Sequence, residues 1–171
     1  MKYKNTQQGF SIVEAMVGIS VLAFFLITII GSFILFIKTT ADNTQRIQAV
    51  YLLEEGMESI RFERDENWNN ISLLNTANTY VLNITSSNIT LPIQGGVNTG
   101  EIILDDTVFT RKFTVEDVCR HNGTNEIMDV CSFPTYTDSN IRRIHMSVEW
   151  TPRDGIGVYT QTLEGYIANI F

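Results

Sequence analysis

The sequence predicts an α+β protein in which one long N-terminal helix packs on an antiparallel β-sheet. Three observations lead to this prediction: a continuous apolar run over residues 10–37, periodic apolar residues over 39–66, and short β-forming runs over 67–171. The first predicts a transmembrane half of the helix over residues 10–38, the second an amphipathic continuation, and the third an exported β-rich globular head. A chain of 171 residues leaves room for one head of modest size.

The apolar run has the length and composition of a membrane-spanning helix. Ala15 to Ile37 contains no charged residue, and at about 1.5 Å per residue it exceeds the roughly 30 Å hydrocarbon core of a bilayer. A cleaved secretory signal would be shorter and would end in a small-residue site, whereas residues 38–42 read KTTAD. We therefore expect the run to be retained.

Charges near the run predict its orientation. Lys2 and Lys4 precede it and Lys38 follows it, so the positive-inside rule keeps the N-terminus in the cytoplasm and exports the head. Glu14 is the only charge inside the run. A charged side chain at the bilayer centre costs roughly 2.5–3.5 kcal/mol on insertion scales, so Glu14 needs a partner or a place near the cytoplasmic headgroups.

Beyond Lys38 the apolar residues become periodic. One helical stripe is predicted from Ile47, Val50, Leu53, Met57 and Ile60, which recur at three- and four-residue spacing. The opposite side is interpreted as a solvated face and carries Arg46, Glu55, Glu58 and Glu66. Gly56 is either a position of close packing or a weak spot. The turn-forming stretch 65–70 (DENWNN) ends the helix.

The remaining residues predict antiparallel strands. Short β-branched or aromatic runs cover Tyr80 to Thr85, Glu101 to Leu104, Val108 to Val115 and Arg143 to Trp150. In the last of these, Ile144, Met146, Val148 and Trp150 alternate with polar residues, which predicts one buried and one solvated face. The turn-rich residues 151–157 then lead into Val158 to Leu163, which predicts a hairpin.

The charge balance disfavours one class of partner. The net charge is −7 and the pI is about 4.7, whereas nucleic-acid binding needs clustered Lys and Arg. The only adjacent basic pairs, Arg111-Lys112 and Arg142-Arg143, are interpreted as solvated faces. No nucleic acid is expected as a partner.

The start of the chain resembles a known signal. A short basic leader ends in Gly9 and is followed by Phe10-Ser11-Ile12-Val13-Glu14-Ala15. This pattern is similar to the class III signal of type IV pilins and type II secretion pseudopilins. The signal combines a glycine before the cleavage site, an apolar residue after it, and glutamate at the fifth position of the mature chain.

The resemblance implies a processing and assembly pathway. It implies that residues 1–9 are a leader removed by prepilin peptidase after Gly9, that the new amine of Phe10 is N-methylated, and that Glu14 acts in subunit assembly. The implied fold is pilin-like. The implied partners are other pilin subunits, the inner-membrane platform and the assembly ATPase, and the implied location is the bacterial inner membrane and then a periplasmic or extracellular filament.

A second, less specific resemblance concerns the kind of subunit. Leu53 to Arg61, Arg64-Asp65 with Trp68, and Val148 to Trp150 look similar to minor pilins of the pilus-modification kind. The sequence therefore favours a minor type IV pilin. Two alternatives stay open: a type II secretion pseudopilin, and a single-pass anchored binding domain that does not assemble.

Two cysteines, Cys119 and Cys131, fit export into an oxidising compartment, where such a pair usually forms a disulfide. Closing a loop of this size would constrain the unfolded chain by roughly 3 kcal/mol. The chemical alternative is a reactive thiol or metal site at Cys119-Arg120-His121, which lacks further ligands.

Other candidate sites are weaker. Residues 65–69 begin like a calcium loop, but no glycine follows at the sixth position. Asp105-Asp106 is interpreted as a hairpin turn in preference to a calcium ligand. Gly95-Gly96 lacks the lysine of a phosphate loop, and His145 is expected on the solvated strand face. We predict no catalytic residues, cofactor or metal site, and no enzymatic activity.

Overall fold

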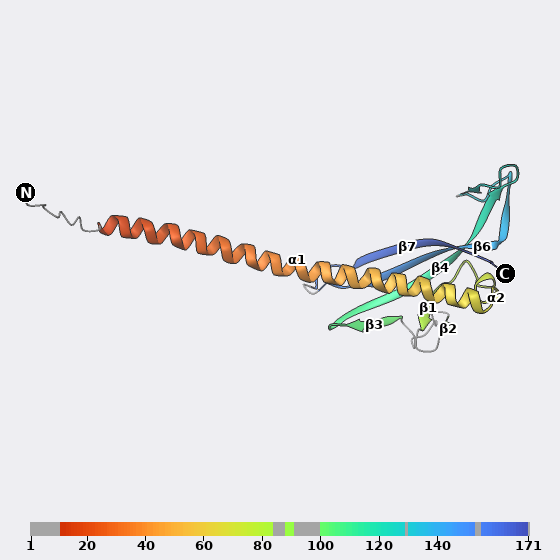
Figure 1. Ribbon diagram of the computed structural model, residues 1–171, viewed down its shortest axis with the longest axis horizontal. Coiled ribbons are helices and arrows are strands. Elements are labelled where there is room, and N and C mark those ends of the chain that lie inside the picture. Colours follow the sequence, from red (N-terminus) through yellow and green to blue (C-terminus); the bar gives the residue numbers. More distant parts are fainter. Residues whose placement is uncertain (1–10, 84–87, 91–99, 129, 153–154, 171) are drawn as a thin grey trace, which may run out of the picture. The chain divides into compact units, whose positions relative to one another are not determined.

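The structure is a computed structural model, and it describes residues 11–83, 88–90, 100–128, 130–152 and 155–170 (Figure 1). It contains helices α1 (Ile12–Glu66) and α2 (Asn69–Ser72). The strands are β1 (Thr79–Asn83), β2 (Asn88–Thr90), β3 (Glu101–Leu104), β4 (Thr107–His121), β5 (Ile127–Met128), β6 (Thr135–Trp150) and β7 (Tyr159–Ala168). The chain forms two compact units, residues 1–43 and 44–171, and α1 contributes to both.

The apolar part of α1 in the first unit, residues 12–40, is exposed throughout. Its large apolar side chains are between 48% exposed at Val21 and 80% exposed at Ile12. This helix is long and apolar enough to cross a membrane. An apolar surface of this extent requires a nonpolar environment, which a bilayer or packed neighbouring helices would provide.

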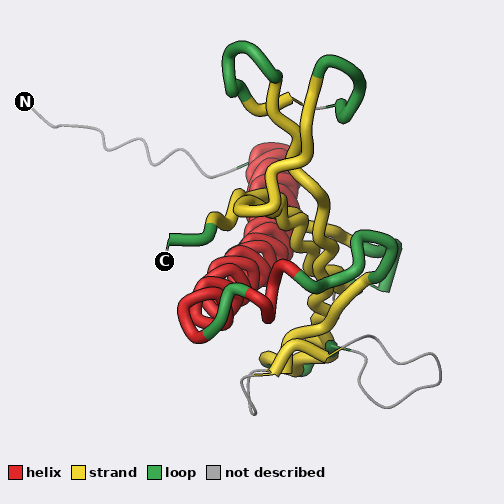
Figure 2. Tube along the Cα trace, turned by 90° about the vertical axis from the view of Figure 1, so that its right-hand side faces the viewer, coloured by secondary structure: helices red, strands yellow, loops and turns green. Residues whose placement is uncertain are grey.

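The second unit is an antiparallel sheet packed on the C-terminal half of α1. The strands follow the order β2-β1-β4-β6-β7, and β3 and β5 pair with β4. Figures 1 and 2 show the long strands running beside this part of the helix. The predicted α+β fold, with a long N-terminal helix on an antiparallel sheet, is therefore confirmed.

The predicted strands are present, and several are longer than expected. Residues 108–115 lie within β4, and β6 begins eight residues before Arg143, at Thr135. Ile144, Met146, Val148 and Trp150 are all buried, as their alternation predicts. The predicted hairpin joins β6 to β7. The predicted continuation of β1 into residues 84–85 lies outside the described residues.

The core lies between the sheet and the helix. Buried residues of α1 include Leu52, Leu53, Met57 and Ile60, and these pack with the inward side chains of β4 and β6. Aromatic rings contribute much of this contact: Phe109 lies against Trp150 with ring centroids 5.8 Å apart, and Tyr80 lies against Phe113 at 5.4 Å. Such pairs stabilise a core beyond their buried area.

The predicted helical stripe is partly wrong. Leu53, Met57 and Ile60 are buried, but Ile47 is 56% exposed and Val50 is 39% exposed. The buried row instead begins at Gln45 and Ala49. Gln45 is tolerated there because its amide donates a hydrogen bond to the Thr107 hydroxyl at 3.0 Å.

The interpretation of the basic pairs as solvated faces is also wrong for three of the four side chains. The Arg111 side chain is 2% exposed, and those of Arg142 and Arg143 are 14% and 18% exposed. Each forms an ion pair with a carboxylate, which offsets part of the cost of burying a cation. The Lys112 side chain is 39% exposed, which agrees better with the predicted solvated face.

Two predicted backbone features are confirmed. A Cβ atom placed on Gly56 would overlap the Met146 sulfur and lie 3.1 Å from Arg111 Cδ, so this glycine allows β4 and β6 to approach the helix closely. Asp105 and Asp106 form the β3–β4 hairpin turn with φ angles of 47° and 64°. Positive φ at both central residues is the geometry of a type I′ turn.

Candidate functional site

The apolar half of α1 is the first candidate site, and its single carboxylate lies in the first helical turn. Glu14 is exposed and is the acidic residue of that turn. The partial positive charge of a helix N-terminus favours a carboxylate in this position. Gly9 and Phe10, the predicted cleavage and methylation positions, lie outside the described residues, as do Lys2 and Lys4.

Polar side chains within the apolar half make local hydrogen bonds. The hydroxyls of Ser20, Thr28 and Ser32 donate to the carbonyls of Val17, Phe25 and Thr28 at 2.8–2.9 Å. These bonds satisfy each hydroxyl within its own helix, which lowers the free-energy cost of placing it in a nonpolar environment. The segment is thus compatible with a bilayer or a packed helical bundle along its whole length.

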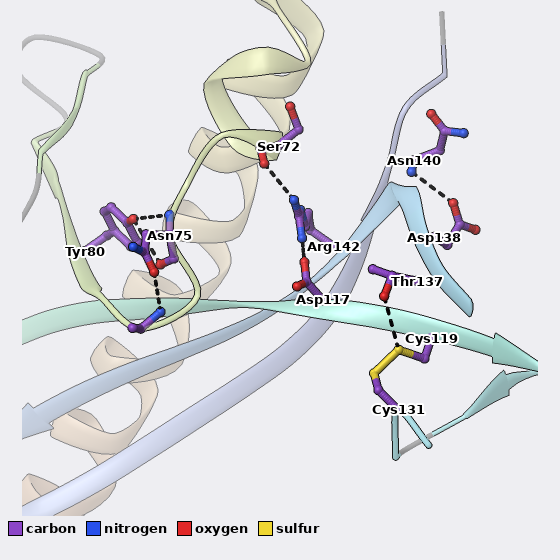
Figure 3. Close-up of polar contacts among 11 residues, drawn as sticks. Ser72, Asn75, Tyr80, Asp117, Cys119, Cys131, Thr137, Asp138, Asn140 and Arg142 are labelled. Atoms are coloured by element: carbon purple, nitrogen blue, oxygen red, sulfur yellow. Dashed lines mark hydrogen bonds and ion pairs between the residues drawn. A yellow bond between two sulfur atoms is a disulfide. The ribbon is translucent and has the colours of Figure 1, made fainter. Parts of the chain in front are cut away.

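The second candidate site is the loop closed by Cys119 and Cys131. The predicted disulfide is present, with 5.4 Å between the Cα atoms. Cys119 is buried on β4, where it pairs across the sheet with Thr137 of β6 and Met128 of β5. Figure 3 shows the disulfide beside Thr137, whose hydroxyl oxygen lies 3.9 Å from the Cys119 sulfur. The alternative of a free reactive thiol is excluded in this state.

A charged pair fixes the base of the disulfide loop. Arg120 Nε donates to Asp138 Oδ2 at 2.6 Å, and Arg120 Nη1 donates to the Asn125 carbonyl at 2.7 Å. The hydrogen bond from Arg120 holds the pKa of the Asp138 carboxyl below its usual value, with a further contribution from the Asn140 N–H. The Tyr136 hydroxyl donates to Asn125 Oδ1 at 3.1 Å, so β4, β6 and the loop are joined by side chains.

The end of this loop and the residues that follow it are strongly exposed. Val130, inside the loop, is 67% exposed, and Phe133, two residues after Cys131, is 95% exposed. His121 Nδ1 accepts hydrogen bonds from the N–H groups of Gly123 and Thr124, at 3.1 Å and 3.3 Å. Figure 2 shows the loops at this end of β4 and β6 extending beyond the rest of the sheet.

Arg142 connects the sheet to the segment that follows the long helix. Its guanidinium forms an ion pair with Asp117 and donates to the Ser72 carbonyl at 2.7 Å (Figure 3). Asp117 lies where the β4–β6 register shifts. The arginine therefore satisfies a carbonyl of the short helix α2 and a carboxylate at the β-bulge.

The other predicted sites do not converge on a reaction centre. Asp65 forms an ion pair with Arg64, and Asp105 accepts a hydrogen bond from Gln48 at 2.7 Å. His145 Nε2 lies 3.1 Å from Glu116 Oε2, and His145 Nδ1 lies 3.0 Å from Glu164 Oε1. The imidazole is therefore held between two carboxylates on the polar strand face and does not contact solvent alone. Among the described residues, no three His, Cys, Asp or Glu side chains are grouped as metal ligands. Residues 95–96 lie outside the described part of the chain.

The hollows on the second unit are open and shallow. One, of about 500 Å³, lies along the helix beside Tyr51, Glu54 and Leu104. A second, of about 300 Å³, lies beside Arg46, Ile47 and Tyr51. Ligand sites are usually enclosed clefts with convergent polar groups, and neither hollow has that form.

Comparison with known proteins adds no further evidence on identity. No protein-family model, curated protein or solved structure matches the chain.

Proposed function

We propose that this chain is a minor type IV pilin, a structural subunit that prepilin peptidase processes and the pilus machinery assembles into a filament. The observation that carries the proposal is the exposed apolar helix with one carboxylate, Glu14, in its first turn. The class III signal around Gly9 and Phe10 supports it from the sequence. The disulfide in the head supports export.

The proposed mechanism starts with the new N-terminus. Cleavage after Gly9 in the cytoplasm would leave Phe10 with a free α-amino group, which is then methylated. An α-amino group has an unperturbed pKa of about 7.7–8.0 and is largely cationic at neutral pH. In a nonpolar bundle of packed helices, this cation would pair with the Glu14 carboxylate of a neighbouring subunit, because an unpaired charge there is costly.

The proposal assigns the chain no catalytic step of its own. It is the substrate of the peptidase and of the N-methylating activity, and the platform and assembly ATPase extract its helix from the inner membrane. The same pathway would serve a secretion pseudopilus. Recovery of the chain from a surface pilus or from a periplasmic pseudopilus would distinguish a type IV pilin from a secretion pseudopilin.

Mass measurement tests the processing step. Intact mass and N-terminal sequencing of the protein from its native membrane should give a chain that begins at methylated Phe10, with a deficit of two hydrogens for the Cys119–Cys131 bond. A chain that begins at Met1 would instead establish an unprocessed single-pass anchor.

Substitution of Glu14 tests the assembly step. Glu14→Ala should leave export and cleavage after Gly9 unchanged, but it should remove the subunit from sheared filaments. Ser32→Ala is the matched control, because Ser32 lies in the same helix and its hydroxyl bonds only to the Thr28 carbonyl. Equal incorporation of Glu14→Ala and the wild type would contradict the proposed role of Glu14.

A further inference from the structure

Among the strands that the structure describes, β7 has an open edge that is long and regular. It lies at one end of their order and has ten residues, whereas β2 at the opposite end has three. Its pairing with β6 runs without a register shift from Tyr159 to Ala168. The strand contains no proline and no lysine. Natural proteins usually protect a sheet edge with a short strand, a bulge, proline or charged side chains. β7 carries a single charged side chain, Glu164, so this long edge is only weakly protected and has the properties of an edge that a partner covers.

The register identifies the backbone groups on that edge. The Asn169 N–H donates to the Asn140 carbonyl at 2.8 Å. In an antiparallel ladder, the residues that bond to a given neighbour recur at every second position, so the odd-numbered residues of β7 bond to β6. The even-numbered residues, from Thr160 to Ala168, then direct their N–H and C=O groups to the open edge. The next strand pair is consistent with this assignment. If the even-numbered residues of β6 bond to β7, its odd-numbered residues bond to β4, and the odd-numbered residues of β4 then bond away from β6. The Arg111 N–H does so, because it donates to the Gly100 carbonyl.

Side chains on the two faces of β7 differ in chemistry. Ile167 is buried in the core and Leu163 packs against it, whereas Thr160, Thr162 and Glu164 are exposed. The Glu164 side chain is 65% exposed and contacts His145. A strand added here would place one set of its side chains beside Leu163 and Ile167, and the other set on the polar face that carries Glu164.

Pairing of two copies of β7 is disfavoured by charge. A two-fold antiparallel pair that uses all five outward-facing residues joins Thr160 to Ala168 and Thr162 to Tyr166, and it places Glu164 opposite its own copy. Like charges directly opposite each other destabilise a strand pair. The strand therefore favours a different sequence as its partner.

We propose that the open edge of β7 binds an extended segment of another protein chain by β-strand addition. The segment carries Lys or Arg opposite Glu164 and apolar side chains beside Leu163 and Ile167. Main-chain hydrogen bonds to the even-numbered residues supply the affinity, and the basic residue supplies the specificity. This inference goes beyond the proposed function, and its test needs no filament.

A peptide pair tests the proposal on the full chain in detergent micelles. The probes are two fluorescent peptides of alternating threonine and valine, one with a central lysine and one with a central glutamate. The lysine peptide should bind about fivefold more tightly, as expected for one cross-strand charge pair. Equal affinities, or no binding of the lysine peptide, would overturn the proposal.

Substitutions at Thr162 test the location. Thr162→Pro removes one outward N–H and leaves the ladder to β6 intact, because proline is tolerated where the N–H faces away from the sheet. It should abolish binding of the lysine peptide, whereas Thr162→Val, which keeps the N–H, should bind like the wild type. Retained binding by a folded Thr162→Pro chain would place the peptide elsewhere and refute the proposal.

Hydrogen exchange of the wild-type chain gives an answer that does not depend on the folding of any variant. On binding of the lysine peptide, the amides of Thr160, Thr162, Glu164, Tyr166 and Ala168 should exchange more slowly. The odd-numbered amides of β7, already bonded to β6, should not change. Protection confined to another part of the chain would contradict the assignment of the site.

Discussion

Arg111 and Glu55 join the sheet to the helix across the core of the head. Arg111 Nη1 lies 3.0 Å from Glu55 Oε2 and donates to the Leu52 carbonyl at 2.9 Å. The guanidinium is buried and the glutamate is half exposed. Burial lowers the pKa of Arg111 from its usual value, and the charge of Glu55 and its hydrogen bond act in the opposite direction.

This relationship predicts an ordered set of stabilities. Glu55→Ala should lower the free energy of unfolding by about 1–3 kcal/mol, because it leaves a buried cation with one partner fewer. Arg111→Met should cost less, within about 1.5 kcal/mol, because the thioether fills similar space without a charge. Denaturant unfolding of the full chain in micelles measures both values. The control is Lys112→Ala. Lys112 Nζ lies 3.8 Å from Glu149 Oε2 in an exposed ion pair, so the free energy of unfolding of this variant should stay within about 0.5 kcal/mol of the wild type. A larger loss for Arg111→Met than for Glu55→Ala would refute this account.

Gly56 provides a second prediction. Alanine is favoured over glycine by about 1 kcal/mol in a helix interior, but a Cβ here would overlap Met146. Overpacking of this kind costs typically about 1–3 kcal/mol, so we expect Gly56→Ala to lower the melting temperature of the head. Gly31→Ala in the same helix is the control, because a Cβ at Gly31 meets no atom within 4 Å. Equal melting temperatures of the two variants would contradict the predicted overlap of a Cβ at Gly56 with Met146.

Glu63 predicts an unusual pH dependence. This residue is 7% exposed, and its pKa is raised, first by burial and then by the charge of Glu66, against a hydrogen bond from Asn70. A carboxyl with a raised pKa in the folded state stabilises the fold below its unfolded pKa, and this stability is lost as the pH rises through the folded value. Glu63→Gln should therefore be more stable than the wild type at pH 7, and the difference should vanish in acid. Unfolding measured across that range tests this sign.

Asp138 is the matched comparison for that experiment. Its pKa is lowered by the hydrogen bond from Arg120, so its contribution is present above the unfolded pKa and is lost as the pH falls through the folded one. Asp138→Asn should be less stable than the wild type at pH 7, with the gap closing in acid. If both variants were more stable than the wild type at pH 7, or both less stable, the ionisation of Glu63 and Asp138 would not explain their stabilities.

The disulfide gives a prediction for redox conditions. Replacement of both Cys119 and Cys131 by serine should lower the stability of the head by roughly 3 kcal/mol, because the unfolded chain gains freedom when the loop is opened. The same loss should follow reduction of the wild type, and reduction should not change the double variant. Thermal unfolding with and without reductant measures this. A reductant effect of equal size in both proteins would rule out the bond as its cause.

The sequence predicts features that depend on local pattern. The alternation at Ile144, Met146 and Val148 is local, and all three are buried. Asp105-Asp106 also forms a turn by its own conformational preferences. The face of a helix that meets a sheet depends on distant strands, and the exposure of Ile47 and Val50 could not be read from spacing alone.

Buried charge is the other kind of feature that local pattern misses. Arg111 alternates correctly with its strand neighbours, but its partner Glu55 lies in a helix far earlier in the sequence. The inward direction of Arg111 is readable, because Phe109, Phe113 and Val115 share its face of β4. A cation in that row signals a buried pair, and only the fold identifies the partner.

The placement of the disulfide affects how the head would respond to proteases. Cys119 and Cys131 enclose a polar loop that joins β4 to β5, and such loops are preferred sites of nicking. A single cut between Arg120 and Val130 would leave both fragments covalently joined. The long β4–β6 ladder, which lies on both sides of that cut in sequence, would keep its register. A head closed in this way would stay in one piece after a nick that would divide a chain without the bond.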